Sequence, residues 1–301
     1  VPSELFPRCY GTTEYIGRVC ASAAQQTGLS EKTAVAAGGG DQLMQSIGNG
    51  MVKPGDATVN IGSSGRVCFQ IDKPVLNPEL NTNMFCGYRK GSWILFGATM
   101  TAGLSLEWWH RIIGEISYDV LNKEVDAIPA GSGGVVFLPY LNGERTPHVN
   151  PNLSGMFIGV NIGTTRAHMT RAVMEGVAFS LMQCIEICGS LGFNAKTLVA
   201  SGGGARSKPW LQLQADIYNI PLRISETTEQ AGMGAALAAG VGAGVYSNLE
   251  EACRIAVSYK DELIIPDPQR HQVYSEYYEF YKKTYLSSKD ELQKAALMGR
   301  R

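Results

Sequence analysis

The sequence predicts an α/β domain in which helices cover a central β-sheet. From Thr33 onward, short apolar runs that end in glycine-rich turns alternate with segments of helical periodicity. The 301 residues are 45% hydrophobic, which allows a substantial core in one large domain or two smaller ones. Strands and helices mixed in this way indicate helices packed on the faces of a sheet, and no internal repeat is evident.

The predicted strands are short apolar runs bounded by turn residues. They cover residues 33–37, 57–61, 67–70, 93–96, 135–138, 198–201 and 222–224. The first thirty residues instead contain scattered prolines and glycines with weak periodicity. We therefore expect them to belong to a segment that continues upstream.

Helical periodicity is clearest over residues 166–191, where apolar side chains recur every four residues and predict a core-facing helix. A second helix is predicted to begin at Ser207, which can cap it, with Pro209 in its first turn. A third covers about residues 229–239, and a closing helix covers about 269–286.

The closing helix carries a tyrosine stripe at helical spacing: Tyr274, Tyr277, Tyr278, Tyr281 and Tyr285. Such a stripe can be a partner surface. We favour the alternative, in which the helix packs its tyrosines back on the domain with the hydroxyls at the rim.

Charge and hydropathy favour a small-molecule substrate. The net charge is −1 and neither sign forms a long block, which argues against nucleic acid or anionic lipid as a partner. The most apolar stretch, residues 231–245, is too short and too rich in glycine and alanine to span a bilayer comfortably. No membrane segment is predicted.

The cysteines predict a reduced, cytoplasmic protein. The 7 cysteines are an odd number without a Cys-x-x-Cys pair, and no secretory leader precedes them. Cys184 and Cys188 share one helix face, but no further ligand lies at suitable spacing. We therefore predict that they pack in the core, and we predict no transition metal.

Three glycine-rich turns follow predicted strands and suggest a polyphosphate ligand. They are Gly38-Gly39-Gly40-Asp41-Gln42, Gly62-Ser63-Ser64-Gly65 and Gly202-Gly203-Gly204-Ala205-Arg206-Ser207. Glycine allows successive backbone N–H groups to approach one anion, and serine adds hydroxyl donors. One such cluster is more often an ordinary turn, but three in one α/β chain favour nucleotide binding. None is a Walker A loop or a convincing Rossmann fingerprint.

Asp41 is the residue of most chemical interest, because it follows a predicted strand and a glycine triplet, at the sheet edge where α/β folds bind ligands. It could accept the proton of an attacking hydroxyl. An aspartate here could equally cap a helix, and these residues alone leave both readings open.

Residues 155–160, Gly-Met-Phe-Ile-Gly-Val, are followed by His168-Met169 and by Ala172-Val173-Met174-Glu175. This pattern resembles the second signature of the FGGY carbohydrate kinases throughout, spacer included. Residues 37–42, 60–65, 139–148 and 201–207 are similar, in the same order, to segments of the xylulose kinase branch. The resemblance covers nearly the whole chain.

The resemblance implies ribonuclease H-like domains of the actin/Hsp70 ATPase superfamily, each with a central mixed sheet flanked by helices. It divides the chain into residues 1–50, the tail of an N-terminal domain carrying the catalytic aspartate, residues 51–286, the ATP-binding domain, and residues 287–301, a tail. Family members begin with an Asp-x-Gly-Thr phosphate loop, and no such motif precedes Asp41. We therefore expect most of the sugar-binding half to be missing and the chain alone to be inactive.

The implied activity is ATP-dependent phosphorylation of a ketopentose, with D-xylulose converted to xylulose 5-phosphate. Asp41 would contact the sugar and act as general base. The implied ATP-binding residues are Gly62, Ser63, Ser64, Gly65, Gly103, Glu107, Gly203, Gly204, Ser207 and Lys208. The segment with Gly103 and Glu107 resembles one that lines the nucleotide site in glycerol kinases, where a glutamine commonly stands in place of Glu107. Mg²⁺ should accompany ATP, held mostly through water and phosphate oxygens.

Other motif residues are expected to be structural. The resemblance assigns Gly232 and Gly234 to close helix packing. In the loop Glu144-Arg145-Thr146-Pro147, an internal Arg–Glu pair is the favoured reading. His148 and His168 have no evident catalytic partners and are expected to pack or face solvent.

Two alternatives remain open. One is a sibling kinase acting on ribulose, gluconate, glycerol or a deoxyketose, and the other is an actin-like nucleotide-binding module that is no kinase. Family members are often dimers, so the resemblance suggests a homodimer, which the sequence alone does not fix.

Overall fold

The computed structural model describes residues 2–299; Val1 and the last two residues of the expected tail lie outside the described residues. Within residues 2–299 the central sheet has seven strands in the order β11-β10-β9-β3-β4-β6-β5. The strands are β3 (Ala57–Ile61), β4 (Gly65–Ile71), β5 (Asn83–Cys86), β6 (Trp93–Thr99), β9 (Leu198–Ser201), β10 (Leu222–Ser225) and β11 (Tyr259–Ile264). β3, β9 and β10 run parallel and the other pairs are antiparallel, so the predicted mixed sheet is confirmed.

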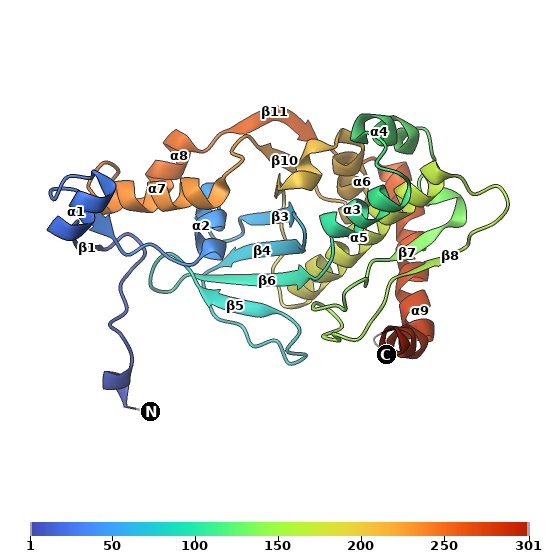
Figure 1. The fold of residues 1–301 in the computed structure, drawn as a ribbon, viewed down its shortest axis with the longest axis horizontal. Helices are drawn as coiled ribbons and strands as arrows, with labels where there is room; N and C mark the ends of the chain where they lie inside the picture. The colour runs from blue at the N-terminus through green and yellow to red at the C-terminus, as the bar shows by residue number, and fades with distance from the viewer. Residues whose placement is uncertain (1, 300–301) are drawn as a thin grey trace.

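Two predicted strands lie outside this sheet. β2 (Ala34–Ala36) pairs with β1 (Tyr15–Arg18), and β7 (Val136–Leu138) pairs with β8 (Met156–Ile158), each as a two-stranded antiparallel sheet. The first thirty residues also contain η1 (Ser3–Leu5) and α1 (Ala21–Thr27), a helix with no buried residue. Figure 1 shows this segment at one end of the molecule, far from the last helix.

The helices α3 (Gly103–Ile112), α4 (Tyr118–Asp126), α5 (Arg166–Ser190), α6 (Lys208–Tyr218) and α9 (Pro268–Met298) gather on one side of the sheet. α5 packs across β4 and β6 and carries the centre of the main core. It is long and apolar enough to cross a membrane. However, 78% of its most apolar 18-residue stretch is buried inside the protein, so it is the core helix.

The opposite face of the sheet contacts α2 (Asp41–Gly48), because Cys68, Ile94, Phe96 and Ala98 point away from α5 and pack against Leu43. Beyond α2 lie α7 (Gln230–Gly242) and α8 (Leu249–Ala256), with a second apolar cluster between them. The packing of α2 on α7 crosses the expected boundary between residues 50 and 51.

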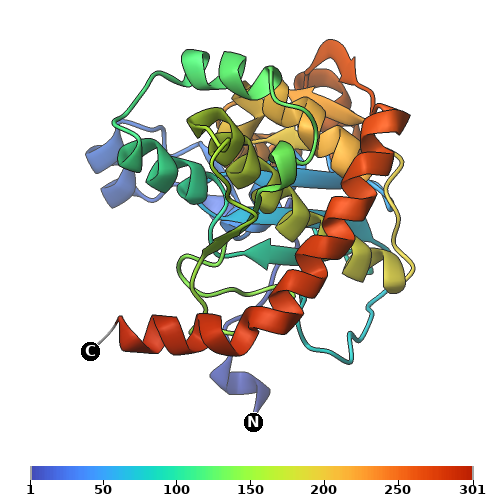
Figure 2. The ribbon, with the colours of Figure 1, turned by 90° about the vertical axis from the view of Figure 1, so that its right-hand side faces the viewer.

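The closing helix differs from its prediction in two ways. It continues to Met298, through the segment expected to be a tail (Figure 2). Its tyrosines do pack on the domain, but Tyr274 and Tyr281 are at most 1% exposed and their hydroxyls are hydrogen-bonded in the interior. The expectation of hydroxyls at the rim is therefore wrong for these two residues.

The expected close packing holds for Gly234 and not for Gly232. A Cβ on Gly234 would lie 1.9 Å from the carbonyl oxygen of Met44 on α2, whereas a Cβ on Gly232 would meet nothing closer than 4.0 Å. α2 and α7 therefore touch through backbone at Gly234, while Gly232 is exposed.

Gly234→Ala is expected to lower the free energy of unfolding by roughly 1–3 kcal/mol, because the added methyl forces the two helices apart. Gly232→Ala is the matched control and should raise it by up to about 1 kcal/mol, since alanine is the better helix former. Urea unfolding of both variants measures the difference. Equal free energies for the two variants would contradict this packing.

Candidate nucleotide-binding site

A cavity lies at the carboxyl ends of two adjacent parallel strands, β3 and β9, where Asn60 is level with Ser201. The glycine turns that follow the two strands meet here, because parallel neighbours end at the same edge of a sheet. The cavity has a volume of about 570 Å³. Its lining comprises Ile61, Gly62, Ser63, Gly103, Leu106, Glu107, Tyr118, Asp119, Asn122, Met174, Gly203, Gly204, Arg206, Ser207 and Trp210.

The glycines at this edge allow backbone segments to touch. A Cβ on Gly204 would lie 2.6 Å from the Cβ of Ile61, and one on Gly103 would lie 2.5 Å from the carbonyl oxygen of Gly62. Both distances are too short for a side chain. The turn after β9 and the start of α3 therefore sit directly against the end of β3, which closes the floor of the cavity.

The turn after β3 presents hydrogen-bond donors at the mouth of the cavity. Its first and last amides are used internally, since Gly62 donates to the Ser64 carbonyl at 3.1 Å and Gly65 to Thr99 Oγ1 at 3.2 Å. Within residues 2–299, the amides of Ser63 and Ser64 donate to no protein group, and both residues are exposed. Free amides and serine hydroxyls are donors suited to phosphate oxygens.

The other end of the cavity is apolar and is fixed by α6. Ser207 caps that helix as predicted, accepting from the Trp210 amide at 3.3 Å, and its hydroxyl donates to Asn122 Oδ1 on α4 at 2.7 Å. Trp210 Nε1 donates to the Met174 carbonyl at 3.1 Å. An apolar wall with a few placed polar groups suits a planar heterocycle.

Seven of the ten residues expected to bind ATP line this cavity: Gly62, Ser63, Gly103, Glu107, Gly203, Gly204 and Ser207. The other three do not. Gly65 is buried, and its Cβ would lie 2.6 Å from Thr99 Oγ1. Ser64 is exposed outside the lining, and Lys208 is 77% exposed and pairs with Glu262 on β11 at 3.0 Å.

The lining also includes residues that sequence reasoning missed: Leu106, Tyr118, Asp119, Asn122, Met174, Arg206 and Trp210. Three of them come from α4, which was not predicted. Ser117 caps α4 by accepting from the Val120 amide, and Asp119 lies in the first turn. That capping pattern was the available signal, although it shows a helix and not its place at the cavity.

Asp41 is the first residue of α2 and is exposed, while Gly40 occupies the capping position. Its Oδ1 accepts from the adjacent Gln42 amide at 2.8 Å. The capping alternative is therefore wrong. Asp41 is not among the residues that line the cavity, so its carboxylate is presented outward from the start of the helix.

The loop after β7 contains no Arg–Glu ion pair. Glu144 is 2% exposed, and its Oε1 accepts from the amides of Met100 and Arg145, each at 2.7 Å. Burial raises the pKa of Glu144 to about 8, with these hydrogen bonds acting in the opposite direction. The favoured reading of the loop is thus corrected: the carboxyl is buried, and backbone amides hold it.

The two histidines have structural contacts. His148 stacks on Tyr285 and its Nε2 lies 2.9 Å from the Tyr140 hydroxyl; burial lowers the pKa of His148 to about 3. His168 forms a capping box with Thr165 at the start of α5. The predicted core packing of Cys184 and Cys188 is confirmed by their burial. Among residues 2–299, no three His, Cys, Asp or Glu side chains gather where they could hold a metal ion.

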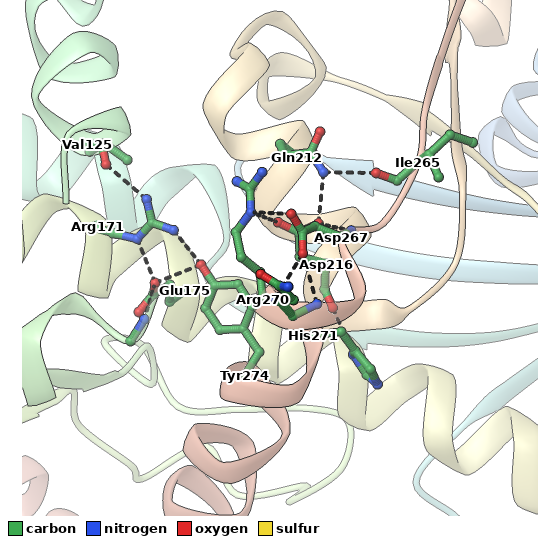
Figure 3. A network of polar contacts seen from close by, with 12 residues as sticks. Val125, Arg171, Glu175, Gln212, Asp216, Ile265, Asp267, Arg270, His271 and Tyr274 are labelled. Carbon is green, nitrogen blue, oxygen red and sulfur yellow. Dashed lines mark hydrogen bonds and ion pairs between the residues drawn. The ribbon is translucent and has the colours of Figure 1, made fainter. Parts of the chain in front are cut away.

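A buried polar network fixes α5 behind the cavity (Figure 3). Arg171 donates to Glu175 Oε1 at 2.8 Å, to the Val125 carbonyl at 2.9 Å and to the Tyr274 hydroxyl at 2.6 Å. Glu175 also accepts from Ser132 and from the Gly131 amide. The network joins α5 to α4 and α9, and Met174, which lines the cavity, lies between its two charged residues.

The chain matches the C-terminal domain of the FGGY family of carbohydrate kinases over residues 57–243. The chain belongs to this family. It is 35% identical over 291 residues to a xylulose kinase of Bacillus subtilis, which covers 96% of this chain and 58% of that protein. An L-xylulose/3-keto-L-gulonate kinase of Escherichia coli is 31% identical, over 93% of this chain and 55% of that protein.

Solved structures support the same fold. A xylulose kinase from Rhodospirillum rubrum superposes with a TM-score of 0.87 at 27% identity, over 97% of this chain and 59% of that one. A ligand-bound xylulose kinase from Lactobacillus acidophilus gives 0.91 at 23% identity, over 98% and 60%. This FGGY chain therefore spans little more than half the length of the relatives it matches, and it corresponds to their C-terminal part.

Proposed function

We propose that this chain is the nucleotide-binding part of an ATP-dependent kinase that phosphorylates a ketopentose, D-xylulose in the first place, to xylulose 5-phosphate. The observation that supports it most is the convergence of seven motif residues around one cavity at the carboxyl edge of β3 and β9. The similarity to xylulose kinases over nearly the whole chain supports the choice of sugar.

In this proposal the apolar wall of Met174 and Trp210 holds the base, and the donors of Ser63 and Ser64 face the phosphates. Asp41 accepts the proton of the attacking sugar hydroxyl, a step for which its exposed position suits it. Mg²⁺ would be held mainly by phosphate oxygens and water, and it would neutralise charge that develops on the transferred group.

The same proposal assigns the two parts of the chain to different domains. Residues 1–50 would be the end of a sugar-binding half that carries Asp41, and residues 51–286 the ATP-binding domain. We propose a cytoplasmic enzyme that works as a homodimer. Because no Asp-x-Gly-Thr phosphate loop precedes Asp41 in these 301 residues, this chain alone should bind ATP weakly if at all and should not phosphorylate xylulose. ATP- and xylulose-dependent release of ADP by the purified chain would contradict this.

L-Xylulose and 3-keto-L-gulonate are second candidate substrates. The L-xylulose/3-keto-L-gulonate kinase of Escherichia coli is 31% identical to this chain and the xylulose kinase of the same organism 30%. The two similarities do not separate the substrates. Turnover of D-xylulose, L-xylulose, 3-keto-L-gulonate, ribulose, gluconate and glycerol by the kinase that contains this chain would decide, and failure of all of them would favour a nucleotide-binding module that is no kinase.

Gly203→Phe is expected to raise the Kd for ATP by roughly tenfold or more, because the ring occupies lining space that the nucleotide needs. A Cβ on Gly203 meets nothing closer than 3.8 Å, so the backbone should tolerate the substitution. Tryptophan fluorescence reports the titration, since Trp210 lines the cavity. Gly232→Ala, at a residue that does not line the cavity, is the control, and an unchanged Kd in Gly203→Phe would place ATP elsewhere.

A further inference from the structure

The loop at residues 139–147 is hydrogen-bonded to the segment that leads from the end of β6 into α3. Glu144 accepts from the Met100 amide. Thr146 exchanges two hydrogen bonds with Ala98, its amide donating to the Ala98 carbonyl at 2.9 Å and its Oγ1 accepting from the Ala98 amide at 3.2 Å. Thr101 donates its hydroxyl to the Pro139 carbonyl. Residues 98–101 are thus held at four points by one loop.

Glu144 also ties this loop to the core helix, since its Oε2 accepts from Ser180 on α5 at 3.3 Å. The carboxyl is the point where the loop, the β6–α3 segment and α5 meet. A buried group with this many partners fixes the relative positions of the elements that it joins.

The next residues of this segment, 102–104, are hydrogen-bonded to the turn that borders the cavity. The amides of Ala102 and Leu104 donate to the Ser63 carbonyl at 2.9 and 3.2 Å, and the amide of Gly103 donates to the Gly62 carbonyl at 2.8 Å. With its carbonyls fixed in this way, the turn presents the free amides of Ser63 and Ser64 outward. The path from Glu144 to these donors is therefore short and consists of hydrogen-bonded backbone.

We propose that Glu144 is a positioning residue for the nucleotide: through Met100 and the start of α3 it sets the place of the Ser63–Ser64 donors. The inference rests on the proposed function for the identity of the ligand. It gives a role to the Glu144-Arg145-Thr146 loop, which lies outside the cavity lining and touches no lining residue through its own carboxyl.

Amide hydrogen exchange tests the first part of the path in the chain itself, without nucleotide. Glu144→Ala is expected to speed exchange at Ala102, Gly103 and Leu104 by roughly tenfold, because the segment that carries these amides loses its anchor. Glu144→Gln should restore slow exchange, since an amide oxygen can accept from the same two backbone groups. Leu292→Ala, which removes a buried side chain of α9, is the matched destabilised control.

If exchange at residues 102–104 rises equally in Leu292→Ala and Glu144→Ala, Glu144 contributes only to the overall stability of the fold, and the proposal is overturned. A Gln variant as fast as the Ala variant would also overturn it. If Glu144→Ala does not fold, Glu144→Met, which fills the buried site but accepts no such hydrogen bonds, replaces it with the same expected and contrary outcomes.

ATP titration tests the second part. In the kinase that contains this chain, at a temperature where all variants are folded, Glu144→Ala should raise the Kd for ATP by roughly tenfold, while Glu144→Gln and Leu292→Ala stay within about threefold of the unmodified kinase. Faster exchange in Glu144→Ala with an unchanged Kd would overturn the positioning role. If neither the unmodified chain nor the kinase that contains it binds ATP, the proposed function is overturned. The hydrogen-exchange result would remain valid in that case, because it is measured without nucleotide.

Discussion

Asp41→Asn is expected to lower kcat for sugar phosphorylation by roughly 10²–10⁴-fold in the kinase that contains this chain, because the amide cannot accept the proton of the attacking hydroxyl. The Kd for ATP should change by less than about threefold, since Asp41 does not line the cavity. The side-chain oxygen of asparagine can still accept from the Gln42 amide, so α2 should keep its start. ADP release coupled to xylulose addition measures the rate.

Asp290→Asn on α9 is the matched control, an exposed aspartate that does not line the cavity, and its rate should be unchanged. An Asp41→Asn kinase with the rate of the unmodified enzyme would remove Asp41 from the mechanism. A large rise in the Kd for ATP with kcat unchanged would assign Asp41 to nucleotide binding, against the proposed role.

Glu175→Ala is expected to lower the free energy of unfolding by roughly 3–5 kcal/mol, because it leaves the Arg171 guanidinium buried without its counter-charge. Arg171 is 6% and Glu175 is 2% exposed, so water cannot replace the lost carboxylate. Ser132 and the Gly131 amide also lose their acceptor. Urea unfolding followed by circular dichroism measures the loss.

The control is Glu279→Ala, which removes an exposed carboxylate that pairs with Lys282 one turn along α9. It should cost less than about 1 kcal/mol, as surface ion pairs do. The double variant Arg171→Met/Glu175→Leu should recover part of the loss, because no buried charge remains. A double variant as unstable as Glu175→Ala would show that the network stabilises through its hydrogen bonds and not through charge pairing.

The central part of the sheet could be predicted from sequence because its strands are buried. β3, β4, β6 and β9 have apolar runs between turn residues, and each lies within two residues of its predicted bounds at the N-terminal end. β11 was missed because it is an edge strand, Tyr-Lys-Asp-Glu-Leu-Ile, in which four residues are exposed. Edge strands carry charges that discourage further pairing, and this removes the pattern by which a strand is recognised.

By itself the sequence determined the family, the α/β class, the core helix α5 and the glycine turns after β3 and β9. Local sequence patterns indicate these features: apolar periodicity, a serine cap at Ser207 and glycines where backbone segments touch. They also sufficed to name seven of the residues that line the cavity.

Only the tertiary structure decided which charged groups face inward. Lys208 follows the Ser207 cap but pairs with Glu262, and Glu144 is buried and accepts from the Met100 amide. α4 lines the cavity, a place that its capping pattern does not reveal. The reason is that packing between segments distant in sequence sets the positions of long side chains and of unpredicted helices. No local sequence pattern encodes which distant segment a side chain will contact.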